Sequence, residues 1–122
     1  MKLDYNGSVP LFKQIADQLE NEIFNETFKE NEQVPSTTEI SQLYQINPAT
    51  VLKGMNLLVE QKILEKRRGI GMFVTSGALA LIEAKRRNEF LAQHVERFVK
   101  EAKALHISYE ELIVLIRGGY DR

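Results

Sequence analysis

The residues of this chain with the most evident chemistry form a short basic cluster near its middle. Lys62, Lys66, Arg67 and Arg68 fall within seven residues that contain a single acid, Glu65. Ammonium and guanidinium groups at this density are the groups with which proteins contact nucleic-acid phosphates. The same pattern also occurs on ordinary solvated strands. The cluster alone therefore leaves two interpretations open, a nucleic-acid contact or a solvent-exposed surface.

The rest of the chain offers no set of residues typical of catalysis. It contains no cysteine, and its two histidines, His94 and His106, lack a carboxylate at metal-ligand spacing. Gly69-Ile70-Gly71 is not a nucleotide-binding loop, because no helix starts there. No acid, base and nucleophile stand together. We therefore expect no enzyme, no catalytic residue, no metal site and no cofactor.

Charge and hydropathy limit the partners of the chain. The net charge is −1, with residues 1–77 slightly acidic and residues 78–122 slightly basic. Any DNA-binding face must therefore be a local basic patch rather than a global field. The chain starts with polar residues and has no apolar run of the roughly 18 residues that a membrane span needs. We expect no membrane partner and a bacterial cytoplasmic location, which the absence of cysteine suits.

Local signals predict three helices before the basic cluster. Apolar residues recur every four positions from Leu11 to Ile23, directly after Pro10, and predict an amphipathic helix. Ser36 and Glu39 have the spacing of a capping box at the start of a second, short helix. Asn47 followed by a proline is a strong start for a third helix, which fades near residues 61–62.

The residues after the third helix predict a β-hairpin. Two short runs, residues 63–68 and 72–75, flank the glycine turn at residues 69–71. Two helices joined by a tight turn and followed by a hairpin form a winged helix-turn-helix. In such a fold the third helix enters the major groove of DNA and the hairpin lies beside it. The predicted fold class is mainly α with a small β-hairpin, and the first domain spans residues 1–77.

Residues 78–122 are expected to form a two-helix dimerisation segment. One long helix is predicted from Ala78 to about Leu105, and a second from Ser108, whose capping box includes Glu111. Residues 112–116 are apolar all round, which predicts burial on most sides, and Gly118-Gly119 should end this helix. A heptad-like stripe runs along the long helix, with a polar residue filling one position. The residues that we expect to dimerise are Leu81, Ala84, Asn88, Leu91, Val95, Phe98, Leu112 and Leu115. The alternative is that the stripe packs on the last helix and leaves Asn88 solvated.

Four stretches of the sequence, in their order and spacing, resemble the GntR family of bacterial regulators. They are residues 9–15 (Val-Pro-Leu-Phe-Lys-Gln-Ile), 34–40 (Val-Pro-Ser-Thr-Thr-Glu-Ile), 47–51 (Asn-Pro-Ala-Thr-Val) and 67–74 (Arg-Arg-Gly-Ile-Gly-Met-Phe-Val). The third stretch and the short helical tail resemble the YtrA-type branch. The resemblance implies a dimeric repressor that binds double-stranded operator DNA, often next to a transporter operon.

The resemblance also implies roles for particular residues. Ser36 and Thr38 would lie near the DNA backbone, and Ala49, Thr50 and Lys53 would face the major groove. Arg67, Arg68 and Gly69 would form the wing, with the glycine allowing a close approach to the minor groove. Asn47 at the start of the third helix and Lys66 of the basic cluster complete the expected DNA-binding set.

The sequence departs from the family at positions that matter for DNA. The family often has arginine where this chain has Thr38, Pro48 and Leu52, and glycine where it has Lys62. We therefore expect weaker and more salt-sensitive binding that depends on Lys53 and the wing. The alternative function is a winged-helix protein-interaction module with weak or no specific DNA binding. Such a module would have no reason to keep the basic wing.

The pattern leaves the small-molecule effector unknown. Residues 78–122 are expected to be too few to enclose a pocket of several hundred cubic ångströms. An effector would then have to bind between subunits or domains.

Overall fold

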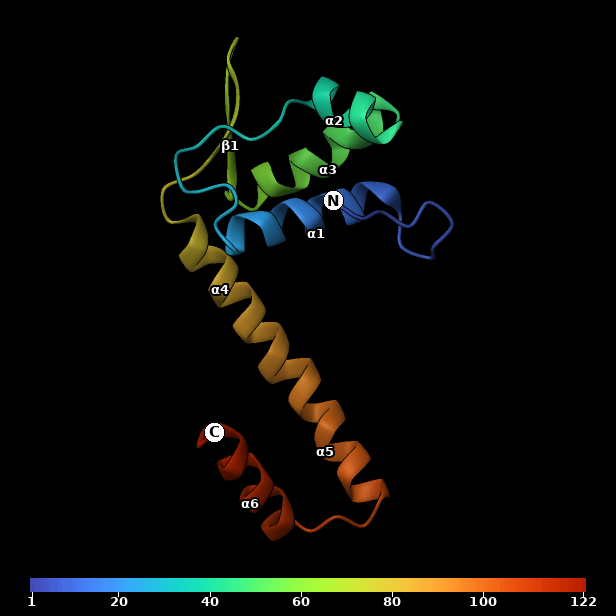
Figure 1. The fold of residues 1–122 in the computed structure, drawn as a ribbon, viewed down its shortest axis with the longest axis vertical. Helices are drawn as coiled ribbons and strands as arrows, with labels where there is room; N and C mark the ends of the chain where they lie inside the picture. The colour runs from blue at the N-terminus through green and yellow to red at the C-terminus, as the bar shows by residue number, and fades with distance from the viewer. The chain divides into compact units, whose positions relative to one another are not determined.

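The computed structural model describes residues 1–122, which form two compact units, residues 1–84 and residues 85–122. The first unit contains helices α1 (Leu11–Phe24), α2 (Thr37–Tyr44) and α3 (Pro48–Glu60), strands β1 (Leu64–Arg67) and β2 (Gly71–Val74), and the start of α4 (Ala78–Glu89). The second unit contains the end of α4, the π-helical turn η1 (Phe90–His94), α5 (Val95–Ala104) and α6 (Tyr109–Tyr120) (Figure 1). The predicted fold, mainly α with one small hairpin, is confirmed.

The helix starts predicted from the sequence are present with their hydrogen bonds. The Glu39 N–H donates to Ser36 Oγ at 3.0 Å, and the Ser36 N–H donates to Glu39 Oε1 at 3.1 Å. The Ala49 N–H donates to Asn47 Oδ1 at 2.8 Å, ahead of a helix that opens on Pro48. These bonds satisfy N–H groups that have no partner within the helix. They fix where α2 and α3 begin, and with that the turn between them.

The end of α3 explains why a glycine would suit position 62. The Lys62 N–H donates to the Val59 carbonyl at 3.0 Å and the Ile63 N–H to the Leu58 carbonyl at 2.9 Å. These two bonds form a Schellman motif, whose αL residue is usually glycine. Lys62 occupies that position with φ 64°. The chain therefore keeps a cation beside the hairpin at the cost of a strained backbone.

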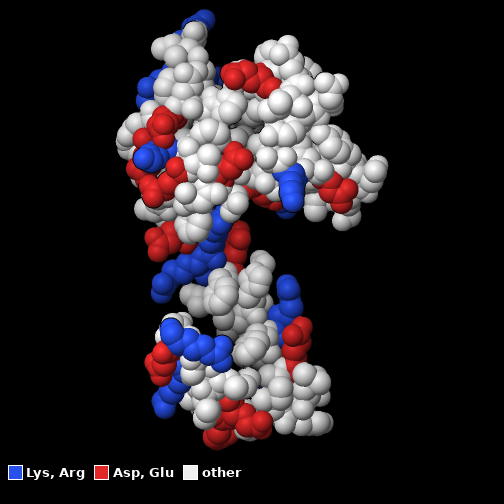
Figure 2. All heavy atoms as spheres, viewed as in Figure 1, with Lys and Arg blue, Asp and Glu red and all other residues white.

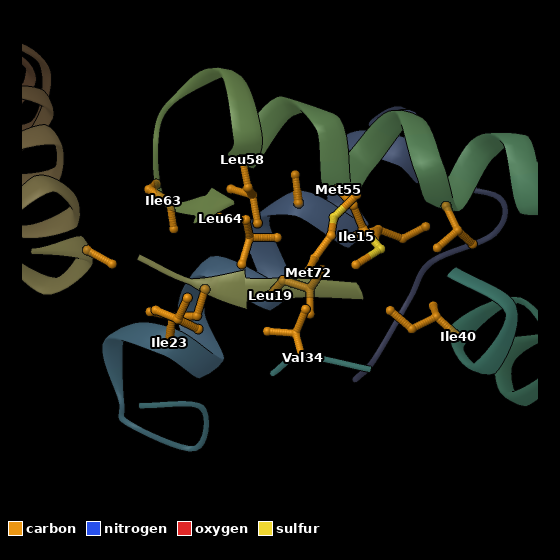
Figure 3. Packing of buried hydrophobic residues seen from close by; sticks show 14 of the residues in the cluster. Ile15, Leu19, Ile23, Val34, Ile40, Met55, Leu58, Ile63, Leu64 and Met72 are labelled. Atoms are coloured by element: carbon orange, nitrogen blue, oxygen red, sulfur yellow. The ribbon is translucent and has the colours of Figure 1, made fainter. Parts of the chain in front are cut away.

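The core of the first unit lies between α1, α3 and the hairpin. Figure 3 shows Ile15, Leu19 and Ile23 of α1 meeting Met55 and Leu58 of α3, all of them buried. The hairpin adds Leu64, Met72 and Val74, and the segment before α2 adds Val34. The repeat of four that predicts α1 thus marks its buried face. Helices α1 and α3 cross at Gly54, where an added Cβ would lie 2.5 Å from the Phe12 carbonyl oxygen.

The hairpin is held by a third extended segment that the sequence pattern does not reveal. Strands β1 and β2 pair antiparallel, with Leu64 opposite Val74 and Lys66 opposite Met72. On the other edge of β2, the Val34 N–H donates to the Met72 carbonyl at 3.0 Å, and the Val74 N–H donates to the Glu32 carbonyl at 2.9 Å. Strand β2 is therefore hydrogen-bonded on both of its edges, to β1 on one side and to residues 32–34 on the other.

The start of α4 belongs to the first unit. Ala78 and Ile82 are fully buried in its core. The Glu30 carboxylate accepts the Gly77 N–H at 2.8 Å and the Leu79 N–H at 3.1 Å, and so caps the helix from far away in the sequence. The predicted boundary between a domain of residues 1–77 and a segment of residues 78–122 stays a prediction. The compact unit itself extends to Ala84.

The second unit departs from the sequence prediction in three ways. The long helix contains the π-helical turn η1, whose extra residue breaks the 3.5-residue repeat between Leu91 and Val95. Helix α6 does not end at Gly118-Gly119 but continues to Tyr120, because neither glycine adopts the positive φ that would end it. The apolar residues 112–116 are not buried on most sides in the single chain: Val114 is 69% and Leu115 67% exposed.

None of the helices is both long enough and apolar enough to span a membrane.

Candidate nucleic-acid interface

A cleft of about 440 Å³ separates the hairpin from the two central helices of the first unit. One wall consists of the start of α2 and the exposed side of α3, including Ser36, Thr38 and Leu52. The other wall is the hairpin from Lys66 through Met72, including its turn. The cleft thus brings together the α2 and wing residues of the predicted DNA-binding set, although they are far apart in the sequence, whereas the predicted residues of the third helix, Asn47, Ala49, Thr50 and Lys53, do not line it.

The first turns of α3 present small and apolar side chains. Ala49, Leu52 and Lys53 are exposed and Thr50 is half-buried, whereas Val51 belongs to the core. Residues three and four apart lie on one helix face, so Ala49, Leu52 and Lys53 share the outward face. This is the part of a recognition helix that reaches base edges.

The predicted capping residues already use their side chains. Ser36 Oγ and Asn47 Oδ1 each accept an N–H of the helix that they start. Their main contribution is therefore to place the ends of α2 and α3. Thr38, the second residue of α2, has an exposed side chain on the wall of the cleft.

Lys53 has an intramolecular partner in this structure. Its Nζ lies 4.0 Å from the centre of the Phe12 ring, which comes from α1. A cation over an aromatic face at this distance is attracted by about 0.5–1 kcal/mol when exposed. Lys53 would have to leave this ring to reach a phosphate or a base, and the small energy involved makes that exchange easy.

The basic residues of β1 lie on opposite faces of the hairpin. Side chains alternate along a strand, and Lys66 lies opposite Met72 on the face that lines the cleft. Arg67 takes the other face, where its Nη2 is 2.8 Å from Glu65 Oε1 and its guanidinium carbon is 3.9 Å from the centre of the Phe73 ring. Lys66 therefore points to the cleft side, while Arg67 is paired within the hairpin.

The tip of the wing is a tight turn. The Ile70 N–H donates to the Arg67 carbonyl at 3.0 Å, and Gly69 has φ 78°. A type II turn needs a positive φ at its third residue, which explains glycine there. Arg68 and Ile70 flank this glycine with exposed side chains. The turn therefore projects a cation and an apolar side chain together.

Charge on the first unit is local, as the sequence predicts. Figure 2 shows basic side chains at the tip of the hairpin and beside it, while acidic side chains intersperse with basic ones over the base of this unit. The surface over α2 and α3 in this view is mainly uncharged, apart from an acidic patch beside the hairpin in the region of α2. Electrostatic attraction to DNA would therefore come from the wing rather than from the helices.

Among the lining residues of the cleft that are outside the expected DNA-binding set, two expose large apolar side chains. Leu52, noted only as a place where an arginine is missing, and Ile70 at the tip both line it. Their signal in the sequence was weak, because an isolated apolar residue on a polar surface is common.

The expected dimerisation residues are mostly uncovered in the single chain. Leu81, Leu91, Phe98 and Leu115 are among the exposed large apolar residues, and Ala84 and Asn88 are exposed too. Val95 and Phe98 line a groove of about 700 Å³ within the second unit, whose other wall is α6 with Leu112. This groove is open between the helices and not enclosed, so the expectation that the segment is too small to enclose a pocket of this size stays a prediction.

The cleft, the short helix pair and the basic hairpin define a winged helix-turn-helix of the DNA-binding type. Residues 11–74 match the model of the family "Bacterial regulatory proteins, gntR family", and the chain belongs to this family. It is 28% identical to the HTH-type transcriptional regulator YhcF of Bacillus subtilis over 93% of its own length and 92% of that protein. It is 25% identical to the HTH-type transcriptional repressor YtrA of Bacillus subtilis over 98% of its own length and 96% of that protein. The chain is YtrA-like in its whole extent.

A solved structure supports the same fold. A GntR-family transcriptional regulator from Bacteroides thetaiotaomicron is 32% identical, with a TM-score of 0.74, and the match covers 91% of this chain and 96% of that chain. The similarity extends beyond the winged helix into the C-terminal helices.

Proposed function

We propose that the protein is a dimeric transcriptional repressor that binds a palindromic operator through the cleft between α3 and the wing. The observation that carries this proposal is the cleft itself, where Lys66 and Arg68 flank a helix face of the size that the major groove admits. Membership of a family of bacterial regulatory proteins supports it. Repression is proposed by analogy with YtrA. No catalytic step is assigned, and the proposed location is the bacterial cytoplasm.

The electrostatic part of the binding rests on few residues. Helices α2 and α3 contain one basic residue, Lys53, and no arginine. Phosphate contacts must then come from Lys66, Arg68 and, once released, Arg67 and Lys53. Each phosphate contact adds about 0.9 to the slope of log affinity against log salt concentration. We therefore propose an operator complex of moderate affinity with a shallow salt slope. This replaces the expectation of more salt-sensitive binding, because fewer phosphate contacts make the affinity less sensitive to salt.

Binding to DNA from the upstream region of the protein's own gene tests the proposal. Lys66→Ala and Arg68→Ala should each weaken binding across all sequences and reduce the salt slope by about one. Lys29→Ala is the matched control, because Lys29 is an exposed lysine of the same unit that does not line the cleft. A wild-type protein without preference for any upstream duplex over random DNA would favour the protein-interaction alternative.

The second unit supports the dimeric part of the proposal. It has 38 residues, of which Ala102 is the only buried hydrophobic one. Its exposed large apolar residues are Phe90, Leu91, Val95, Phe98, Val99, Leu105, Tyr109, Val114, Leu115, Ile116 and Tyr120. Units below about 40 residues usually need oligomerisation, disulfides or metals to be stable. The chain has no cysteine, so a second copy is the proposed cover, and two copies would present two α3 helices to a palindrome.

The genes under control are proposed only as a class. YtrA-like regulators often act on neighbouring transporter operons by the family resemblance, and we propose such an operon here. Transcript levels of the adjacent genes in a deletion strain would test it. Repression predicts that they rise, and unchanged levels would argue against an operon next to the gene.

A further inference from the structure

We infer that α3 reads thymine methyl groups instead of guanine edges, and that Leu52 is the residue that sets this preference. The inference rests on the proposed function, because it assumes that α3 and the wing bind duplex DNA. It goes further in naming the base feature that is recognised and the side chain that recognises it.

Helices α2 and α3 offer few side chains that could read guanine. Guanine is typically read in the major groove by arginine or lysine, which donate to its O6 and N7. Helices α2 and α3 have no arginine, and their single lysine, Lys53, lies over the Phe12 ring. The only donor of the kind that guanine requires is therefore one lysine, which lies over an aromatic ring in the free protein.

The second step is what α3 offers in place of a donor. Ala49 and Leu52 lie three residues apart in the first two turns and share the outward face. Leu52 is 38% exposed and lines the cleft beside Thr38. Alkyl groups in this position pack against the C5-methyl group of thymine, which is the only methyl group that the four unmodified bases present in the major groove.

The third step is that the surroundings select a nucleic acid as the occupant of this apolar surface. Lys66 and Arg68 form the opposite wall of the cleft with Gly69, so a polyanion is attracted to the site where Leu52 lies. An apolar protein partner would gain little from these cations. Duplex DNA satisfies both walls, with phosphates near the wing and methyl groups near α3.

Removal of single methyl groups from DNA tests the inference. A duplex is first selected by the wild-type protein from a pool of random sequences. Each thymine is then replaced in turn by deoxyuridine, which removes the methyl group and keeps the base pair. We expect one or two positions per half-site where affinity falls about fourfold, the effect that burial of one methyl group corresponds to.

The same duplexes identify the side chain. With Leu52→Ala the deoxyuridine effect should vanish at the position that Leu52 contacts, as a mutant cycle between two touching groups requires. Leu43→Ala is the matched control, because Leu43 is 73% exposed on α2 and does not line the cleft. A second variant, Leu52→Arg, should select duplexes with guanine at that position, which a merely structural role would not cause.

The outcomes separate this inference from the proposed function. If the protein selects no duplex, the proposed function fails and the inference with it. If it selects one but no deoxyuridine lowers affinity, the function stands and methyl recognition is overturned. If deoxyuridine lowers affinity equally for wild type and Leu52→Ala, methyl recognition stands and the role of Leu52 is overturned.

Discussion

Two basic side chains near the cleft have aromatic partners in the free protein. Lys53 lies over Phe12 and Arg67 over Phe73. Such contacts hold long side chains in defined positions while leaving the charge near the surface. DNA binding then competes with these contacts instead of ordering a free side chain. The strength of the DNA complex should therefore respond to changes in the intramolecular partners.

Glu65 is the partner whose removal should strengthen DNA binding. Its carboxylate accepts from Arg67 Nη2 at 2.8 Å and Nε at 3.1 Å, and both side chains are more than a third exposed. An exposed pair contributes about 0–1 kcal/mol, so Glu65→Gln should barely change the unfolding temperature. It should release Arg67, raise affinity for the operator several-fold and steepen the salt slope by up to about one. Fluorescence titration at several salt concentrations measures both.

A matched control separates release of Arg67 from a general change of charge. Glu26→Gln removes the same charge from an exposed site after α1, away from the wing. It should leave the salt slope unchanged. An equal gain from both variants would mean that Arg67 is not the residue released.

At the scale of elements, the crossing of α1 and α3 positions α3, which forms one wall of the cleft. Gly54 allows it, since a Cβ there would lie 2.5 Å from the Phe12 carbonyl oxygen and 3.2 Å from Ile15 Cβ. Alanine normally favours a helix over glycine by about 1 kcal/mol, but forcing a methyl group into a packed crossing costs about 1–3 kcal/mol. Gly54→Ala should therefore lower the free energy of unfolding by up to about 2 kcal/mol, as measured by urea titration.

Gly118 offers the control for this substitution. It also lies inside a helix, α6, but no atom lies within 4 Å of an added Cβ. Gly118→Ala should raise stability by up to about 1 kcal/mol. Stabilisation by both alanines would show that α1 and α3 do not approach as closely as the structure has them.

The capping of α4 by Glu30 should make the stability of the protein depend on pH in the acid range. Hydrogen bonds from the Gly77 N–H and then the Leu79 N–H lower the pKa of Glu30 below 4.5. A group with a lowered folded-state pKa stabilises the protein above its unfolded pKa, and this contribution is lost as pH falls through the folded value. Below about pH 4.5, wild-type stability should therefore fall more steeply than that of Glu30→Gln.

Thermal unfolding over a series of acid buffers measures this difference. Glu60→Gln, at an exposed carboxylate at the end of α3, should keep the wild-type slope. Parallel curves for wild type and Glu30→Gln would show that the capping bonds do not persist in solution.

The elements that sequence predicts here are those fixed by neighbouring residues. The capping boxes at Ser36 and Ser108, the Asn47 cap and the repeat of four in α1 involve partners within a few positions. The cap of α4 by Glu30 joins residues 47 and 49 positions apart, and no local rule contains it. The pairing of residues 31–34 with β2 and the contact of Lys53 with Phe12 also join residues that are far apart in the sequence. The α2 and wing residues of the cleft were thus predictable from the sequence, but Leu52, Ile70 and the internal pairings were not.

At the scale of the whole molecule, the two units differ in how they are stabilised. Residues 1–84 contain all but one of the buried hydrophobic residues, whereas residues 85–122 contain only Ala102. Burial of apolar area supplies most of the free energy of folding. The first unit can therefore be stable within one chain, while the second depends on what covers its apolar residues. If a second copy covers them, the stability of the second unit must depend on protein concentration.

Thermal unfolding of the full chain at two concentrations tests this dependence. Unfolding is followed by far-UV circular dichroism at about 2 and about 200 µM protein. The unfolding temperature of the second unit should rise by several degrees at the higher concentration, while that of the first unit stays unchanged. Leu115→Glu places a charge among the exposed apolar residues of α6 and should abolish the dependence and give a monomer in sedimentation. Leu43→Glu, on the exposed side of α2, should keep it. A wild-type monomer at micromolar concentration, with unfolding independent of concentration, would overturn the dimer. Each chain would then bind DNA weakly on its own.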